Sequence, residues 1–381
     1  MPIAELTRNA VDVLPEGALE AKLKLGRPLR VKFGIDVTSP DIHVGRAVQL
    51  QRLRAFQDEG HTAVLIVGDY TTRIGDPSGR SAERPVLTDE EIDANAKTYL
   101  DQAMIILDRD RTEVRHNGEW LSNLSYADIV GLTRRFTVAR MLERDDFAKR
   151  YAAHEPISVS EMLYPIMQAY DSVAVEADVE LGGTDQLYNL LAGRELMQDY
   201  GMDPQVVITG PLLLSWDGLK MSSSVGNNIP LTAPPDDMYG RTMRIPDSQL
   251  EEWWTLVAEQ PVPQGEPMQA KLALARWIVT RSHGEDAARA AEEHFARVVQ
   301  RGEAPEDMPE RSLPTGDPVH LPALLADAFG LSTSEARRLI GQGAVKVDGD
   351  AVGELDLPRN RLAGAVLQAG KRRFVRLNGA A

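Results

Sequence analysis

The chain has 381 residues, and its 57 acidic and 42 basic residues give a formal net charge of −15. Because about 100–200 residues make one domain, this length predicts two or three domains. A content of 43% hydrophobic and 26% charged residues is typical of a globular protein and excludes a disordered or fibrous one. The absence of cysteine excludes a disulfide scaffold, a thiol nucleophile and cysteine-ligated metal sites.

The start of the sequence lacks the apolar core of a signal peptide, and no apolar run approaches the ~18 residues of a membrane span. We therefore expect a cytoplasmic protein with no membrane partner. The acidic balance argues against indiscriminate nucleic-acid binding. Residues 319–381, however, contain 9 basic and 6 acidic residues, so their net charge of +3 is opposite in sign to that of the rest of the chain.

The first part of the chain, residues 1–230, alternates short apolar runs with amphipathic stretches. This pattern predicts βαβ units and an α/β fold with a Rossmann-like parallel sheet. Strands are expected at 29–35, 63–68 and 206–208, and helices at 43–59 and 132–151. Gly60 is a natural C-terminal cap for the first of these helices.

The second part, residues 231–305, has helical periodicity at 271–282 and 285–300 and is expected to be a helical domain. Residues 306–318 are rich in Pro, Gly and acidic residues and are predicted to be a linker. Residues 319–381 are expected to form a small α+β domain. It should contain a helical pair at 322–330 and 334–342 and short strands at 344–347, 365–367 and 373–376.

A first chemical motif runs from the end of a predicted strand, through a polar turn, into a helix: GIDVTSPDIHVGR, residues 34–46. In an open α/β sheet, ligands bind beyond the carboxyl ends of the strands. Backbone N–H groups at a helix start suit phosphate, and His43 and Arg46 add polar or positive groups. Gly45 permits a close approach to the backbone. The alternative is an ordinary turn with an N-cap at Ser39 or Asp41.

A second motif is GLKMSSS, residues 218–224, in which a lysine is followed by three hydroxyl residues. The ammonium group of Lys220 could follow phosphate charge during a reaction. Taken alone, the segment could also be a solvated loop. The two motifs lie about 175 residues apart, one on each side of the predicted sheet.

A third feature is a predicted helix on which Tyr164, Gln168 and Asp171 share one face, with Pro165 expected at its first position. Burying three polar groups without a polar ligand is costly. A phenolic hydroxyl would find its acceptor in Asp171 and an exchange partner in Tyr164. A partly exposed helix with one polar edge is the alternative.

Together these segments resemble the class I aminoacyl-tRNA synthetases. HVGR and KMSSS are similar to their HIGH and KMSKS motifs. The stretches VKFGIDVTSPDIHVGR, IGDPSGR, YPIMQAYDS, LGGTDQ and GLKMSSS resemble, in order and spacing, the bacterial tyrosyl-tRNA synthetases. The resemblance covers the whole chain, and residues 319–381 resemble the small RNA-binding domain that ends these proteins.

The resemblance implies a role for each matching position. The catalytic residues are His43, Arg46, Lys220 and Ser223. The tyrosine-binding residues are Thr71, Asp76, Tyr164, Gln168, Asp171 and Gln186. The ATP-binding residues are Gly34, Asp36, Thr38, His43, Gly45, Gly183, Asp185, Lys220 and Met221. Basic residues expected to bind tRNA are Arg337, Arg338, Lys346, Lys371, Arg372, Arg373 and Arg376.

The implied reaction joins tyrosine to ATP as tyrosyl-adenylate and then transfers tyrosine to the 3′ end of tRNA(Tyr). ATP is expected with Mg²⁺ held by phosphates and water, without a dedicated protein metal site. A homodimer with contacts near 132–151 and Glu161 is expected by analogy. Four positions depart from the family pattern: Lys32 replaces a Tyr, Val37 a Pro, Arg46 the second His of HIGH, and Ser223 the second Lys of KMSKS.

Three alternatives remain open at this point. A tryptophanyl-tRNA synthetase would bind an indole, which offers only a donor, to the same polar pair. A related adenylyltransferase would not transfer to tRNA, and such proteins lack a KMSSS-type loop combined with an RNA-binding tail. A catalytically impaired RNA-binding paralogue is made conceivable by the changes at Arg46 and Ser223.

Overall fold

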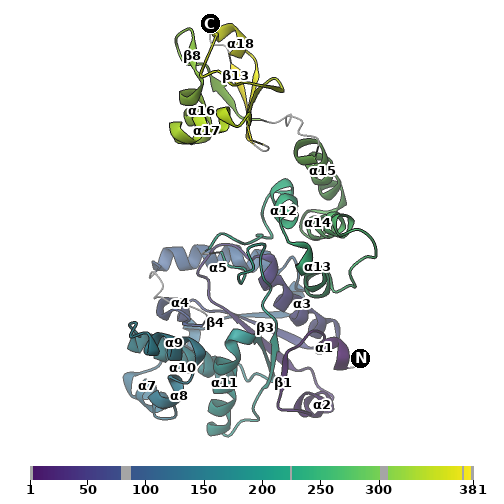
Figure 1. Ribbon diagram of the computed structural model, residues 1–381. Coiled ribbons are helices and arrows are strands. Elements are labelled where there is room, and N and C mark those ends of the chain that lie inside the picture. The colour runs from purple at the N-terminus through teal and green to yellow at the C-terminus, as the bar shows by residue number, and fades with distance from the viewer. Residues whose placement is uncertain (1–2, 79–86, 224, 301–307, 371–372, 379–381) are drawn as a thin grey trace. The chain divides into compact units, whose positions relative to one another are not determined.

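The computed structural model describes residues 3–78, 87–223, 225–300, 308–370 and 373–378 (Figure 1). The chain divides into two compact units. The first comprises Met1–Ala233 and Arg241–Leu274, and the second comprises Pro234–Gly240 and Ala275–Ala381. The finer division of the chain at residues 230, 305 and 318 stays a prediction.

A six-stranded sheet forms the centre of the first unit, in the order β1-β6-β5-β2-β3-β4. Its strands are β1 (Asp12–Leu14), β2 (Arg30–Ile35), β3 (Thr62–Val67), β4 (Thr112–His116), β5 (Val179–Gly183) and β6 (Val206–Gly210). All neighbours pair in parallel except β1, which is an antiparallel edge strand on β6. The apolar runs of β2, β3 and β6 are buried, as is usual for parallel strands covered on both faces. The predicted parallel sheet is thus confirmed.

Helices cover both faces of this sheet (Figure 1). One face carries α3 (Val44–Asp58) and α5 (Asp89–Ala103), and the other carries α10 (Val159–Ala174) and α11 (Leu187–Asp199). Right-handed crossovers explain this arrangement, since the chain moves from β2 to β3 and β4 in one direction and from β5 to β6 in the other. The direction changes between β2 and β5, which is where open α/β sheets bind ligands.

The expected single helix over 132–151 is wrong. The chain instead forms α7 (Tyr126–Thr133), α8 (Val138–Met141) and α9 (Asp145–Ala152). The side chain of Thr137 caps α8 by accepting from the backbone N–H of Arg140, so a new helix starts there. Arg144 lies in extended backbone before α9. Its guanidinium binds Asn189 of α11, so a tertiary contact overrides the helical pattern of this segment.

The helix α10 begins six residues earlier than Pro165 predicts. Ser158 and Glu161 form a capping box at its start, in which each side chain accepts from the other residue's backbone N–H. Pro165 therefore lies inside the helix, where it has no N–H to donate. The expected common face of Tyr164, Gln168 and Asp171 is nevertheless formed, because all three line one cavity.

Shorter elements connect the main ones. They are α1 (Ile3–Leu6), α2 (Ala18–Leu23), α4 (Thr71–Ile74), η1 (Arg109–Arg111), α6 (Gly118–Leu121), η2 (Thr184–Gln186), η3 (Asp247–Gln249), α13 (Leu250–Trp253) and η4 (Trp254–Ala258). The helices predicted at 271–282 and 285–300 correspond to α14 (Pro267–His283), α15 (Glu285–Phe295) and η5 (Ala296–Gln300). The boundary between the two units runs through α12 (Pro235–Thr242) and α14.

The carboxyl-terminal domain has a five-stranded sheet in the order β10-β9-β12-β13-β7. These strands are β7 (Glu310–Ser312), β9 (Val345–Val347), β10 (Asp350–Ala351), β12 (Val366–Ala369) and β13 (Arg373–Asn378). The remaining elements are β8 (Val319–His320), α16 (Leu321–Phe329), α17 (Thr333–Gly341), β11 (Asp356–Leu357) and α18 (Arg359–Leu362). The predicted helical pair and α+β fold are confirmed. Strand β7 lies within the segment predicted as a linker and pairs with β13.

One apolar cluster joins α16 and α17 to one face of this sheet, through residues such as Leu325, Ile340, Val345 and Leu367. This domain therefore has a core of its own. Within the described ranges of the chain, no helix combines the length and the apolar character that crossing a membrane requires.

Candidate active site

A cavity of about 940 Å³ lies in the first unit, beyond the carboxyl ends of β2, β3 and β5. It is lined by every residue predicted for catalysis, tyrosine binding and ATP binding. These are Gly34, Asp36, Thr38, His43, Gly45, Arg46, Thr71, Asp76, Tyr164, Gln168, Asp171, Gly183, Asp185, Gln186, Lys220, Met221 and Ser223. The cavity thus joins five separate segments of the sequence: 34–46, 71–76, 164–171, 183–186 and 220–223.

His43 lies at the start of α3 and is its N-cap, so the alternative caps Ser39 and Asp41 are wrong. Its Nδ1 atom accepts a hydrogen bond from the backbone N–H of Arg46. Burial, reinforced by the charges of Arg46 and Lys220, lowers the pKa of His43 to about 3. The ring is therefore neutral at pH 7, and with Nδ1 accepting, its proton is on Nε2 as the remaining donor.

Arg46 lies one turn into α3 and its guanidinium is held by Tyr99 of α5. Nη1 donates to the Tyr99 hydroxyl at 2.6 Å, and the guanidinium carbon lies 5.6 Å from the centre of the Tyr99 ring. Although burial acts to lower the pKa of Arg46, Tyr99 and Asp36 together raise it. A permanent positive charge therefore lines the cavity next to the start of α3.

The loop with the KMSSS motif closes another side of the cavity. Nζ of Lys220 lies 2.5 Å from a carboxylate oxygen of Asp185, which follows β5. The Met221 sulfur accepts from the backbone N–H of Gly45 at 3.4 Å, so this loop contacts the start of α3. A β-carbon at Gly45 would lie 3.2 Å from Nδ1 of His43 and 3.4 Å from that sulfur, which explains the glycine. The hydroxyl of Ser223 accepts from Asn228.

Asp171 also lines the cavity and is 3% exposed. Trp120 donates to one of its carboxylate oxygens at 2.8 Å, and Asn117 donates to the other at 3.3 Å. Burial raises the pKa of Asp171 to about 7, against the opposing effects of Lys32, Trp120 and Asn117. The site therefore presents a buried carboxylate held by two neutral donors, suited to accept from a further neutral hydrogen-bond donor.

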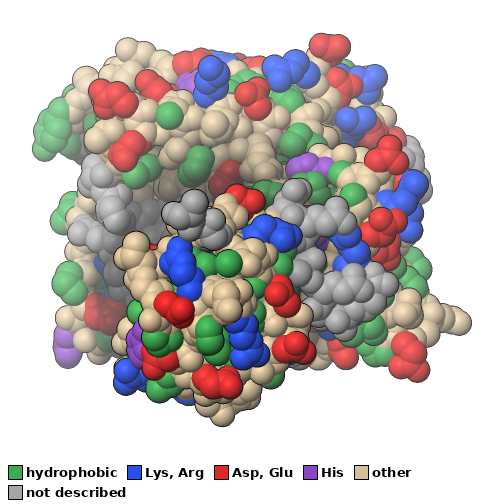
Figure 2. Space-filling view, turned by 90° about the horizontal axis from the view of Figure 1, so that it is seen from above, with side chains coloured by type: hydrophobic (Ala, Val, Ile, Leu, Met, Phe, Trp, Pro, Cys, Tyr) green, Lys and Arg blue, Asp and Glu red, His purple; other side chains and the backbone are tan. Residues whose placement is uncertain are grey.

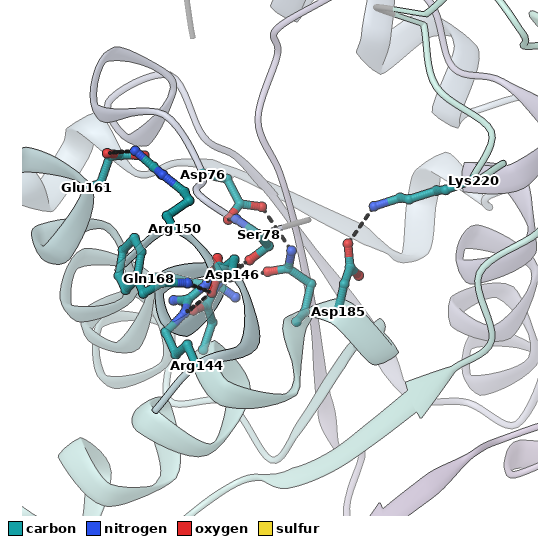
Figure 3. A network of polar contacts seen from close by, with 12 residues as sticks. Asp76, Ser78, Arg144, Asp146, Arg150, Glu161, Gln168, Asp185 and Lys220 are labelled. Atoms are coloured by element: carbon teal, nitrogen blue, oxygen red, sulfur yellow. Dashed lines mark hydrogen bonds and ion pairs between the residues drawn. The ribbon is translucent and has the colours of Figure 1, made fainter. Parts of the chain in front are cut away.

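The amide of Asn189 on α11 joins two predicted tyrosine ligands. Figure 3 shows Gln168 and Asp76 in this network of polar contacts, together with the ion pair of Lys220 and Asp185. The Asn189 amide donates to the Gln168 carbonyl at 3.1 Å and to the Gln186 carbonyl at 2.9 Å. Gln186 in turn donates to Asp76 at 2.9 Å. The buried Arg144 donates to the Asn189 carbonyl at 2.7 Å and fixes the amide orientation. Gln168, Gln186 and Asp76 thus form one connected polar wall.

The predicted ATP residues at the strand ends are tightly packed. Thr71 donates to Asp36 at 2.8 Å. A β-carbon at Gly183 would lie 2.7 Å from the side chains of both Asp185 and Leu212, so a larger residue there would displace them. Of the four family departures, Arg46 and Ser223 line the cavity, whereas Val37 and Lys32 do not. The side chain of Lys32 is fully buried.

Sequence reasoning missed several residues that position this site: Ser78, Asn117, Trp120, Arg144 and Asn189. Asn117 and Trp120 directly follow β4, a strand whose partly buried residues give no clear apolar run. Finding β4 would have located them, because it ends at the same edge of the sheet as β2 and β3. Arg144 has no local signal, since it acts through Asn189, 45 residues away.

The basic residues predicted to bind tRNA lie in the carboxyl-terminal domain. Arg337 and Arg338 are exposed on α17, and Arg373 is exposed at the start of β13. The strand register places Lys346 and Arg376 on the sheet face opposite the apolar core. Lys371 and Arg372 lie outside the described residues. On the molecular face seen in Figure 2, Lys and Arg side chains are interspersed with Asp and Glu.

Metal-ligating side chains do not gather in the described part of the chain: it contains no group of three or more His, Asp or Glu placed to hold an ion.

The comparisons with known proteins identify a family. Residues 24–300 match the family described as tRNA synthetases class I (W and Y). The chain is 47% identical over 387 residues to a tyrosine–tRNA ligase of Thermotoga maritima, covering 98% of this chain and 96% of that protein. It is 49% identical over 391 residues to that of Moorella thermoacetica, covering 98% and 94% of the two chains.

Solved structures show the same fold. A tyrosyl-tRNA synthetase of Archaeoglobus fulgidus, solved with L-tyrosine, matches with a TM-score of 0.62 at 23% identity, over 76% of this chain and 98% of that one. A mitochondrial tyrosyl-tRNA synthetase of Aspergillus nidulans matches with a TM-score of 0.63 at 21% identity, over 77% and 92%.

The alternatives of a tryptophanyl enzyme, an adenylyltransferase or an impaired paralogue are not favoured, because the relatives that match over nearly their whole length are tyrosine–tRNA ligases. The chain belongs to the tyrosyl-tRNA synthetases of the class I family, and it is an aminoacyl-tRNA ligase.

Proposed function

We propose that the cavity holds tyrosine with its phenol at Asp171 and ATP with its phosphates at the start of α3 and at Lys220. One observation supports this above the others: a single continuous cavity is lined by both sets of residues. A buried carboxylate suits a phenolic hydroxyl donor, and Tyr164 is placed on the same helix to complete the exchange. The wall of Gln168, Gln186 and Asp76 suits the amino and carboxyl groups of the amino acid.

In the first step, a carboxylate oxygen of tyrosine attacks the α-phosphorus of ATP, the bond to the β-phosphate breaks, and pyrophosphate leaves. The Nε2 proton of His43 and the ammonium of Lys220 stabilise charge that develops on the phosphates. Asp185 and the bare backbone at Gly183 hold the nucleoside part. In the second step, a hydroxyl of the terminal adenosine of tRNA attacks the tyrosyl carbonyl and AMP leaves. Both steps need positioning and charge, not a covalent enzyme intermediate.

The remaining partners follow from the reaction. We propose that ATP enters as its Mg²⁺ complex, since Mg²⁺ is usually carried by substrate phosphates and water. We propose that tRNA(Tyr) is held by the helical segment 231–305 and by the basic residues of the domain at 319–381, whose charge is opposite to that of the rest of the chain. A cytoplasmic location is proposed because the reaction needs tRNA.

The experiment that tests this function is ATP–pyrophosphate exchange by the purified full chain with tyrosine, tryptophan or phenylalanine, followed by charging of tRNA. We expect exchange that depends on tyrosine, and tyrosyl-tRNA in the second assay. Exchange driven better by tryptophan, or the absence of exchange with any of the three, would contradict the proposal.

The first prediction concerns Arg46. We propose that its charge partly replaces the second lysine of the family's KMSKS motif, which is Ser223 here. In Arg46→His, single-turnover formation of tyrosyl-adenylate should slow by roughly tenfold, since one cation is lost from the phosphate end. Arg54→His is the matched control, because Arg54 lies on the same helix and pairs with Asp58 outside the cavity. A rate in Arg46→His equal to or faster than wild type would defeat the idea.

The second prediction concerns a homodimer. Four apolar side chains in segment 126–159 are more than half exposed: Tyr126, Val138, Tyr151 and Val159. This segment overlaps the dimer contact area expected from the family, and a dimer formed there would cover these side chains. Light scattering should give twice the mass of one chain. The double variant Tyr126→Ser/Val159→Asp should shift the equilibrium toward monomer at micromolar concentration.

The matched control for the dimer is Leu25→Asp, since Leu25 is also more than half exposed but lies outside that segment. It should keep the mass of the wild type. A wild-type protein that remains monomeric at tens of micromolar would contradict the dimer.

A further inference from the structure

A buried ion pair lies beside the tyrosine end of the cavity and has no part in the reaction described so far. Lys32 of β2 is 0% exposed and Glu180 of β5 is 1% exposed. The ammonium nitrogen lies 2.8 Å from a carboxylate oxygen of Glu180. The two strands are neighbours, and Lys32 and Glu180 face each other directly in the register. Such a pair is weak support for stability, because removing two charges from water costs much of what their attraction provides.

The contacts of the pair lead to the tyrosine-binding helix α10. Besides Glu180, the Lys32 ammonium donates to the backbone carbonyl of Gln168 at 3.1 Å and to the hydroxyl of Ser172 at 2.8 Å. The Gln168 amide donates to the same Glu180 oxygen at 3.4 Å. The other Glu180 oxygen accepts from Ser172 at 2.9 Å and from Gln205 at 2.9 Å. The pair therefore fixes both the backbone and the side chain of Gln168.

The charges of the pair also act on Asp171. The charged groups that act on this carboxylate are Lys32 on β2 and Glu180 on β5, and α6 and its preceding residue supply the neutral donors Trp120 and Asn117. Tyr164 adds a neutral hydroxyl from the helix of Asp171 itself. Lys32 favours the carboxylate form of Asp171 and Glu180 disfavours it, and the effect of Lys32 is the larger.

We propose that the Lys32–Glu180 pair is a positioning unit for tyrosine recognition, in which Lys32 supplies the positive charge that offsets the buried Asp171 and Glu180 holds the Gln168 amide. This inference rests on the proposed placement of the tyrosine phenol at Asp171. Lys32 lies behind the cavity wall and does not line the cavity. It therefore acts on the substrate through Asp171 and Gln168, not by direct contact.

Asp171 takes up a proton as the pH falls through its pKa, and a protonated Asp171 no longer offers the phenol a carboxylate. The KM for tyrosine should therefore rise below about pH 7 in the wild type. Removing the Lys32 charge raises the pKa of Asp171, so the rise in KM should begin at a higher pH.

The test uses the charge-balanced variant Lys32→Met/Glu180→Gln, which leaves no unpaired charge in the core. ATP–pyrophosphate exchange at saturating ATP gives kcat and the KM for tyrosine from pH 6 to 9. The midpoint of the KM rise should move up by about one pH unit, so the KM for tyrosine near pH 7 should increase by roughly three- to tenfold, while the KM for ATP stays within about twofold. Lys32→Arg keeps the charge and should keep the wild-type midpoint.

Lys22→Met is the matched control, because Lys22 is a buried lysine that pairs with Asp178, directly before β5, and with Asp203, and is not among the charged groups that act on Asp171. It should leave the midpoint unchanged. The proposal is overturned if the double variant keeps the wild-type midpoint, or if the KM values for tyrosine and ATP rise together without a shift. The proposed function is tested separately, since its failure would show as a wild-type enzyme without tyrosine-dependent exchange.

Discussion

Replacement of Asp171 by Asn should reduce kcat/KM for tyrosine in ATP–pyrophosphate exchange by about 10²–10³-fold, since the loss of one charged partner in a buried hydrogen bond costs about 3–4 kcal/mol. The change preserves shape but removes the charge that accepts from the phenol. It also places an amide nitrogen against two donors, Trp120 and Asn117, both of which bind the carboxylate in the wild type.

The same variant should lose its preference for tyrosine over phenylalanine. Phenylalanine has no hydroxyl, so its binding does not depend on the carboxylate of Asp171. The tyrosine-to-phenylalanine ratio of kcat/KM is therefore the sharper measurement. Asp101→Asn is the control, because Asp101 is an exposed carboxylate on α5. This variant should keep the wild-type ratio. If Asp171→Asn folds, as judged by circular dichroism, and keeps that ratio, the phenol does not bind at Asp171.

Replacement of Lys220 by Met should lower kcat for adenylate formation by about 10²–10³-fold, a typical effect of removing one group that stabilises transition-state charge. The KM for tyrosine should change by less than about threefold, since the residues proposed to bind tyrosine are not held by Lys220. The ammonium is half-exposed and paired with Asp185 in the free protein, so it can move toward phosphate charge when ATP is bound.

Lys24→Met provides the control for Lys220, because Lys24 is an exposed lysine at the end of α2, outside the cavity. Single-turnover kinetics with saturating ATP and tyrosine separate the chemical step from binding. An unchanged rate of adenylate formation in Lys220→Met, or a loss confined to the KM for tyrosine, would contradict the role of this lysine.

The sequence was most informative where local pattern and chemistry coincide. The apolar runs of β2 and β3 and the start of α3 at His43 were predictable, because a buried parallel strand needs apolar residues on both faces and a helix start needs a cap. The cavity residues could be named in advance because short motifs at strand ends converge at one edge of a parallel sheet. The resemblance to a known family then linked those motifs to one reaction.

The parts that could not be predicted depend on contacts between distant segments. The helical pattern at 132–151 is interrupted because Arg144 binds Asn189, and no local rule reveals that partner. Pro165 suggested a helix start, yet Ser158 and Glu161 supply a stronger capping box upstream. From the sequence, Lys32 indicated only that a Tyr of the family pattern is replaced. In the structure its partner is Glu180, 148 residues later in the chain.

The most direct measurement is a crystal structure of the full chain with a non-hydrolysable tyrosyl-adenylate analogue, such as tyrosinol adenylate. The hydroxyl of its ring should lie within hydrogen-bond distance of Asp171, its phosphate next to His43, and its ribose next to Asp185. An analogue bound elsewhere, or bound in this cavity with its ring at His43 and its nucleoside at Asp171, would show that the assignment of the two ends is wrong.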